Sequence, residues 1–296
     1  MIRKITVLTI VLACLLSLSA LAGDFAVYDG EEYIIYPQGT ETLLLRYIDS
    51  KPYVSASAPY ISSVTVYEDA LYYLLREKGA TYAVKREGDV TERIYRFEGE
   101  ASNLELYDGN LLALVDGGLC LVYPDKELSV RLSSTGMEEF FIYGDSAYFV
   151  SSSDRIEYTV ESTLGTTSAS KGRLCRIDLT NGEITPMTAY GVDQIMLCGD
   201  RIVCRAFDRA FPTTENGEPA VGALRRELDI ETGRIVKQYE DYDWGCYVYE
   251  NNVLLRREGG LYKDDFLFMA IDDSDNVYTC GGELRIVDSA TMEIKQ

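Results

Sequence analysis

The chain has 296 residues, with 48 acidic and 28 basic side chains and no histidine, which gives a formal net charge of −20 at pH 7. A surface of this sign repels nucleic acid and anionic lipid, so neither is expected as a partner. The absence of histidine excludes catalytic triads and dyads that use an imidazole base, and metal centres that use histidine ligands. An enzyme built on this sequence would have to use carboxylates, lysine, tyrosine, arginine or a hard cation.

Residues 1–22 are predicted to be a secretory signal peptide. Two basic residues precede an apolar run over residues 5–21, which is shorter than the roughly 20 residues that a membrane-spanning helix needs. We expect cleavage after Ala22, with lipidation of Cys14 as the alternative. The mature protein is therefore expected to be secreted or held in the cell envelope, with no integral membrane segment after processing.

One pattern that is typical of β-hairpins recurs along the rest of the chain. It consists of an aliphatic residue that is usually followed by a tyrosine, then a turn of Asp, Gly, Asn or Glu, and then a β-branched or aromatic run. The hairpins are expected at residues 27–36, 66–75, 106–115, 142–150, 197–204, 248–255 and 271–279. Most of their starts are separated by about 40 to 50 residues, the length of a propeller blade. No segment shows the sustained spacing of apolar residues that a helix requires.

A second element follows several hairpins and predicts the outer half of each sheet. It is a strand that ends in a polar turn, at residues 174–184, 228–235 and 284–294. Two hairpins make a four-stranded sheet, which must pack against similar sheets around an axis to bury its faces. We therefore predict an all-β protein in which residues 23–296 form a single β-propeller of four-stranded antiparallel blades. Seven blades are favoured, with six blades and an irregular closing sheet as the alternative.

The hairpins of the Tyr-Asp-Gly…Tyr-Tyr type and the outer strands of the Leu-x-x-Ile-Asp-x-x-x-Gly type carry a family resemblance. They resemble bacterial propeller domains similar to the low-density lipoprotein receptor-related propeller, and quinoprotein-type repeats, over nearly all of residues 24–296. Two signatures of these families are missing. No Tyr-Trp-Thr-Asp tetrad occurs, and the tryptophan that docks each quinoprotein blade is absent, since Trp244 is the only tryptophan. The resemblance therefore implies the architecture alone, and we expect no cofactor, in particular no quinone.

Six cysteines remain after processing, and their state is open. In an exported protein an even number of cysteines permits disulfides, but buried thiols that act as small apolar side chains are an equal alternative. The six are Cys120, Cys175, Cys198, Cys204, Cys246 and Cys280.

Two insertions give the candidate binding site. Residues 151–172 and 208–222 fall between the second and third strands of consecutive repeats, so they are expected to stand together on one rim of the propeller. Long loops on a rigid scaffold often carry recognition, and tolerated surface insertions are the alternative. Our first hypothesis is a monomeric binding or scaffolding module for a protein, peptide or glycan. Its contact surface is expected to include Tyr158, Phe207, Arg209 and Phe211.

Paired carboxylates support a second hypothesis, an enzyme of the glycoside hydrolase or lyase type, because glycosidases need two carboxyl groups that flank a bond. With 48 acidic residues such pairs occur by chance, and adjacent strand residues face opposite sides of a sheet, so no catalytic residue is assigned. The pairs are Glu31 with Glu32, Glu138 with Glu139, Asp241 with Asp243, and Asp264 with Asp265.

Two further patterns have a structural interpretation. Residues 272–276 resemble the start of a calcium loop, but Val277 stands where the loop needs glycine, so a hairpin turn is expected and no metal site is assigned. A run of aromatic residues could stack on sugar rings, but such residues more often line the packed layer between sheets. These aromatic residues are Tyr239, Tyr242, Trp244 and Tyr247.

Overall fold

The computed structural model is almost entirely β-strand. It describes residues 25–133, 136–162, 165–211, 220–239, 246–249, 251–257, 259–263, 266–271, 276–280, 283–288 and 290–295. These residues contain 25 strands and one 3₁₀ turn, η1 (Pro124–Lys126). Over these same ranges, no helix has the length and apolar character that crossing a membrane requires. The predicted signal peptide, residues 1–22, lies outside the described residues.

The chain divides into two compact units, which are considered separately. Unit 1 comprises the described residues up to Asp116, Cys120–Val130 and those from Ile271 onward. Unit 2 comprises Gly117–Leu119 and Arg131–Ala270.

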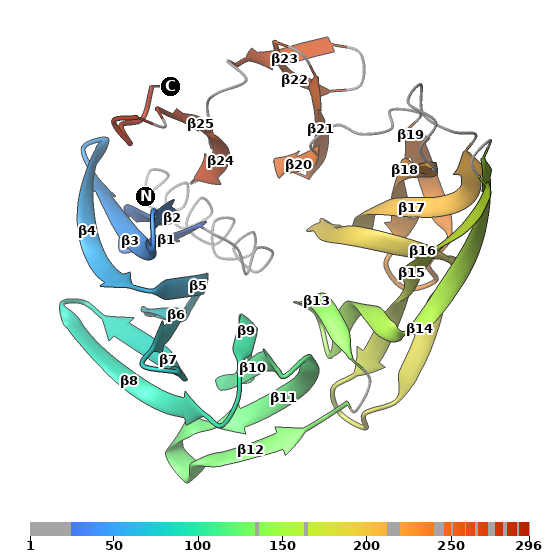
Figure 1. The fold of residues 1–296 in the computed structure, drawn as a ribbon. Coiled ribbons are helices and arrows are strands. Elements are labelled where there is room, and N and C mark those ends of the chain that lie inside the picture. The colour runs from blue at the N-terminus through green and yellow to red at the C-terminus, as the bar shows by residue number, and fades with distance from the viewer. Residues whose placement is uncertain are drawn as a thin grey trace, which may run out of the picture. The chain divides into compact units, whose positions relative to one another are not determined.

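The first part of the chain forms four-stranded sheets whose strands pair in chain order (Figure 1). The first sheet contains β1 (Phe25–Tyr28), β2 (Glu31–Gln38), β3 (Glu41–Ile48) and β4 (Lys51–Ala58). The second contains β5 (Tyr60–Tyr67), β6 (Ala70–Glu77), β7 (Ala80–Glu87) and β8 (Val90–Phe97). The third contains β9 (Ala101–Tyr107), β10 (Asn110–Val115), β11 (Gly118–Tyr123) and β12 (Leu128–Arg131).

Two-residue turns connect many of these strands, because the sequence supplies residues that tolerate positive φ at the corners. Asp29 and Gly30 have φ of 53° and 75°, and Asp108 and Gly109 have φ of 49° and 73°. Two successive positive φ values are the geometry that matches the twist of paired strands. The faces between the first two sheets of unit 1 are filled by one apolar cluster, in which Leu44 and Leu71 are fully buried.

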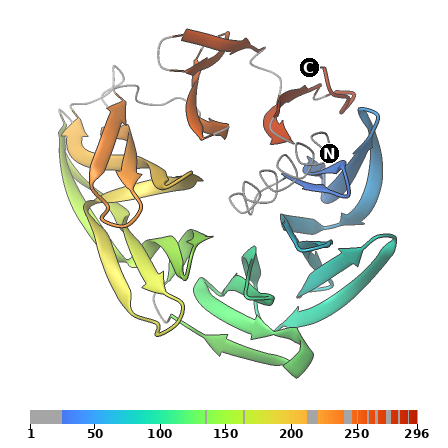
Figure 2. The same ribbon diagram turned by 180° about the vertical axis from the view of Figure 1, so that it is seen from behind.

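The last strands of the chain pack beside the first sheet, within unit 1. β24 (Asn276–Cys280) pairs with β25 (Glu283–Val287), and Val287 forms an isolated bridge with Ile294. The Tyr47 hydroxyl of β3 donates to the Met292 carbonyl at 2.6 Å, and both views show the C-terminal strands beside the N-terminal sheet (Figures 1 and 2). Sheets from the two ends of the chain therefore meet within unit 1.

Met292 occupies a turn position that is glycine in two other repeats. The Gly182 and Gly233 amides donate to the carbonyls of Asp178 and Asp229, four residues earlier, and the Met292 amide donates to Asp288 in the same way. Met292 adopts φ of 61°, which usually favours glycine. Its side chain packs against the apolar cluster of the first sheet, and this contact explains a large residue there.

Unit 2 contains a seven-stranded sheet and a four-stranded sheet. The larger sheet contains β13 (Met137–Tyr143), β14 (Ser146–Ser162), β15 (Gly165–Asp178), β16 (Ile184–Cys198), β17 (Arg201–Phe211), β18 (Ala220–Asp229) and β19 (Ile235–Tyr239). The smaller sheet contains β20 (Cys246–Tyr249), β21 (Asn252–Arg257), β22 (Gly260–Lys263) and β23 (Phe266–Ala270).

The seven-stranded sheet consists of two four-stranded blades that share β16. β15 pairs with β16 up to Gly191, and β17 pairs with β16 from Gly191 to Cys198. One long strand is thus the outer strand of one blade and the inner strand of the next.

The structure confirms an all-β chain of four-stranded antiparallel blades. Six of the expected hairpins are present, and the seventh is described only from residue 276, where it supplies β24. In the described ranges, six groups of four strands are followed by the two-stranded sheet β24–β25 when β16 is counted twice. The number of blades therefore stays a prediction.

Candidate functional site

The two insertions predicted between second and third strands form hairpin arms in unit 2. In the first arm, residues 155–162 of β14 pair with residues 165–172 of β15. In the second arm, residues 209–211 of β17 pair with residues 220–222 of β18. Each arm begins at a register shift, so the insertions extend the strands of their blades.

The base of the first arm is closely packed. Ser151 is fully buried, and its hydroxyl accepts the Asp154 amide at 2.9 Å within the register shift. On the opposite strand, a Cβ on Gly172 would lie 2.1 Å from the Ser151 carbonyl oxygen. Glycine is therefore needed where the arm leaves its blade.

Tyr158 attaches the first arm to the neighbouring blade. Its hydroxyl donates to the Phe207 carbonyl of β17 and accepts the Gly191 amide of β16 at 2.7 Å. A Cβ on Gly191 would lie 2.4 Å from the Lys171 Cβ, so glycine permits the close approach of arm and blade. The Tyr158 hydroxyl thus ties the first arm to two neighbouring strands, β16 and β17.

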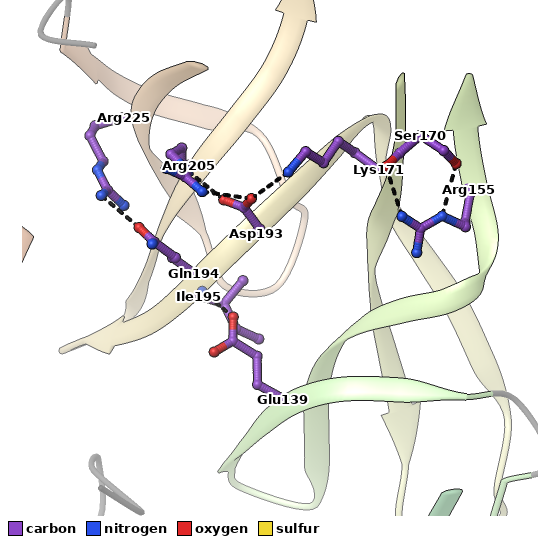
Figure 3. A network of polar contacts seen from close by, with 9 residues as sticks. All are labelled: Glu139, Arg155, Ser170, Lys171, Asp193, Gln194, Ile195, Arg205 and Arg225. Atoms are coloured by element: carbon purple, nitrogen blue, oxygen red, sulfur yellow. Dashed lines mark hydrogen bonds and ion pairs between the residues drawn. The ribbon is translucent and has the colours of Figure 1, made fainter. Parts of the chain in front are cut away.

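Asp193 joins both blades through two cationic side chains (Figure 3). Its carboxylate accepts the Lys171 ammonium at 2.9 Å and the Arg205 guanidinium at 2.6 and 2.9 Å. Burial alone would raise the pKa of the Asp193 carboxyl, but the hydrogen bonds from Arg205 and Lys171 outweigh it and lower this pKa below its usual value. Asp193 is therefore ionised at neutral pH and fixes both cations.

The Phe207 ring lies beneath these cations. Only 4% of Phe207 is exposed, and the Lys171 Nζ and Arg205 Cζ lie 4.3 and 5.5 Å from its ring centroid. Both distances fall within the range of cation–π attraction. The ring therefore supports the charged cluster.

Arg225 adds a buried positive charge to the cluster. It is 6% exposed, and its Nη2 donates to the Gln194 Oε1 at 2.7 Å. Gln194 adopts φ of 52°. It lies directly after Asp193, where the pairing of β16 with β17 shifts in register. Burial lowers the pKa of the Arg225 guanidinium, and the positive charge of Arg205 lowers it further.

The structure brings together two of the four predicted contact residues. Tyr158 is half-buried and bonds to the backbone of the buried Phe207. Arg209 and Phe211 lie in the second arm, and their side chains are outside the described residues. In the aromatic run, Tyr239 is buried and Tyr247 half-buried, and the other two aromatic residues lie outside the described ranges.

Sequence reasoning missed Lys171, Asp193, Arg205 and Arg225. No local charge pattern marks them, because the five arginines within residues 200–227 are balanced by five acidic residues in the same stretch. Their contact depends on how the neighbouring strands are paired.

The carboxylate pairs proposed for an enzyme have structural partners where they are described. Glu31 forms an ion pair with Arg46, and Glu32 lies 3.8 Å from Arg285. Glu139 accepts the Ile195 amide at 2.8 Å. The remaining candidates lie outside the described residues. They are the pairs at 241 and 243 and at 264–265, the side chain of residue 138, and the calcium-like residues 272–275.

Five cysteines are free thiols, namely Cys120, Cys175, Cys198, Cys204 and Cys246. Burial raises the pKa of Cys204 to about 12 and the pKa of Cys175 to about 11. These thiols behave as small apolar side chains. The side chain of Cys280 lies outside the described residues.

Comparisons with known proteins identify the fold. No family model matches the chain, and no curated protein matches its sequence. Hsv2p from Kluyveromyces lactis is similar in structure with a TM-score of 0.54 at 8% identity, over 92% of this chain and 90% of that chain. The Pan2 WD40 domain from Neurospora crassa gives 0.53 at 8% identity, over 91% and 86%.

A prolyl endopeptidase structure gives a TM-score of 0.51 at 10% identity, over 92% of this chain but only 40% of that chain. At these identities the likeness shows the fold alone. Together with the four-stranded antiparallel sheets, it assigns this chain to the β-propeller class, as the sequence predicted.

Proposed function

We propose that this protein is an exported, monomeric β-propeller that binds a protein, peptide or glycan partner through the two arms of unit 2, without catalysing a reaction. The observation that carries the proposal is the attachment of the first arm by Tyr158 and by the ion pairs of Asp193. An arm held in one position loses little conformational freedom on binding, and this favours affinity.

The predicted contact residues have different roles in this proposal. Tyr158 and Phe207 hold the first arm in place, because the Tyr158 hydroxyl bonds to the Phe207 carbonyl and the Phe207 ring lies against the Lys171 ammonium. Arg209 and Phe211 are proposed to contact the partner from the second arm. Binding residues in proteins often lie on loops that a rigid scaffold holds in position.

Export and family resemblance belong to the same proposal. The charge pattern and apolar run of residues 1–22 support a cleaved signal peptide. The turn and outer-strand patterns support a relationship to low-density lipoprotein receptor-related and quinoprotein-type propellers, without a quinone.

A pull-down experiment tests the proposal. The purified protein is compared with a variant in which a short Gly-Ser linker replaces residues 156–171, using culture medium and envelope extract as sources of partner. We expect the wild-type protein to retain a partner that the variant loses. The control for folding is a cooperative thermal melting transition of the variant, lowered by no more than the several degrees expected from loss of the Tyr158 and Lys171 contacts. Equal capture by both proteins would contradict binding through the first arm.

A further inference from the structure

We propose that β23 (Phe266–Ala270) binds an extended peptide that has apolar side chains at its centre and basic side chains at its ends. This strand lies at the outer edge of the smaller sheet of unit 2, and within the described residues it pairs only with β22 (Figure 1). The two arms belong to the larger sheet, so this inference goes beyond the proposed function.

β23 exposes large apolar side chains at consecutive positions. Phe266, Leu267 and Phe268 are 80%, 55% and 45% exposed, and the value for Phe266 is the highest among the large apolar side chains of the described residues. Successive side chains of a strand point to opposite faces of its sheet. The apolar surface therefore extends around the edge of the sheet and is not confined to one face.

The outer strands of the other four-stranded blades carry residues that protect an edge, and β23 does not. Charged side chains and proline on an edge strand oppose pairing with another chain. β23 reads Phe-Leu-Phe-Met-Ala, with no charge and no proline. A register shift also helps to protect an edge, but it occurs in β4, β8, β19 and β23 alike and does not distinguish them. The protective residues of β4, β8, β12, β19 and the outer part of β16 include Lys51, Arg93, Arg131, Lys237 and Pro186.

The polar groups of such an edge match an extended peptide. Phenylalanine and leucine side chains have no hydrogen-bonding group, so the N–H and C=O groups of the backbone supply the hydrogen bonds. A peptide that adds to a sheet edge pairs with these groups and places alternate side chains against the sheet. The apolar side chains of β23 therefore select a peptide with an apolar centre.

Charge selects basic ends for this peptide and disfavours a second copy of the chain. A net charge of −20 repels another copy and attracts a cation. The sequence next to the strand has the same sign, because residues 263–273 contain four aspartates and one lysine. Like charges that meet across paired strands are destabilising, whereas opposite charges stabilise the pair.

Fluorescence anisotropy with a labelled peptide of sequence Lys-Lys-Val-Thr-Val-Thr-Val-Lys-Lys tests this site. We expect the purified protein to bind it, with an affinity that falls between about 20 and about 200 mM NaCl because salt screens the attraction. A peptide with glutamate in place of every lysine is expected not to bind. Replacement of the central Thr-Val-Thr by three prolines removes backbone donors and is expected to abolish binding although the charge is unchanged.

The double variant Phe266→Thr/Leu267→Thr tests the position of the site. Threonine is compatible with a strand, and both side chains are largely exposed, so thermal melting is expected to change little. We expect the basic peptide to bind about tenfold more weakly or worse, because less apolar surface is buried in the complex. The matched control is Ile235→Thr/Val236→Thr in β19, where the two side chains are 48% and 56% exposed. We expect this control to bind the peptide as the wild type does.

Four results would overturn the proposal. They are no binding of the basic peptide at low salt, equal losses in the two double variants, equal affinity for the peptide with glutamate ends, and binding of phosphatidylcholine vesicles without binding of the peptide. Sedimentation velocity adds a fifth. A dimer that Phe266→Thr/Leu267→Thr abolishes would assign β23 to a second copy of the chain.

The variant with a linker in place of residues 156–171 separates this site from the proposed function. We expect this variant to bind the basic peptide as tightly as the wild type does. We also expect Phe266→Thr/Leu267→Thr to retain a partner that is captured through the first arm. Loss of peptide binding in the linker variant would contradict the position at β23, whereas failure of the capture experiment alone leaves the β23 site supported.

Discussion

The second sheet of unit 1 and the first blade of unit 2 both have four antiparallel strands in chain order, but their second and third strands differ in length. In the sheet β5–β8, every strand has eight residues, and the second and third strands meet at the two-residue turn Lys78-Gly79. In unit 2, the corresponding strands β14 and β15 have 17 and 14 residues. The added residues leave the buried part of the blade intact and create an arm. A blade can therefore gain a long hairpin arm at this corner without a change in its core.

The comparison first predicts that both blades depend equally on their cores. Phe149 of β14 and Leu74 of β6 are both fully buried. Replacement of either by alanine leaves a cavity, and we expect each to lower the free energy of unfolding by about 3–5 kcal/mol. Urea unfolding measures both. A loss below about 1 kcal/mol for Phe149→Ala would mean that the arm-bearing blade lacks a packed core of its own.

The second prediction compares two glycines, Gly79 in the β6–β7 turn and Gly172 at the base of the first arm. Gly79 has φ of 78°, and a Cβ added there would meet nothing within 4 Å, whereas a Cβ on Gly172 would lie 2.1 Å from the Ser151 carbonyl oxygen. Gly79→Ala then carries only backbone strain of about 1 kcal/mol. Gly172→Ala forces the arm base apart and is expected to cost about 2–3 kcal/mol. Thermal melting ranks the two, and similar shifts would contradict the tight arm base.

The ion pairs of Asp193 predict that the stability of unit 2 depends on pH. Because the pKa of Asp193 is lowered in the folded state, its contribution is full above the ordinary pKa near 3.8 and is lost as the pH falls through the folded value. We expect Asp193→Asn to cost about 1–3 kcal/mol at neutral pH and less at acidic pH.

Urea unfolding of wild type and Asp193→Asn across this range gives the measurement. The difference between the two proteins should shrink as the pH falls below about 4. A difference that stays constant with pH would show that Asp193 acts through its shape and not through its charge.

The sequence predicted the blades better than the cluster, for a physical reason. A hairpin such as β9–β10 depends on Asp108-Gly109 and on alternation in the adjacent residues, which are all local features. The contact of Lys171, Asp193 and Arg205 depends on the register of three strands. A shift at Gln194 changes which residue faces the arm, and no local pattern determines it. Long-range register is therefore what sequence reasoning lacked.

The smallest expected effect distinguishes structure from recognition. Tyr28 in unit 1 has a hydroxyl with the same kind of partners as Tyr158, since it accepts the Gly88 amide at 2.7 Å and donates to the Asp69 carbonyl at 3.1 Å. Tyr28→Phe and Tyr158→Phe are each expected to cost about 1 kcal/mol in urea unfolding. Only Tyr158→Phe loosens the first arm, so only this variant should weaken capture of a partner. Equal weakening by both would mean that the loss follows general stability and not the position of the arm.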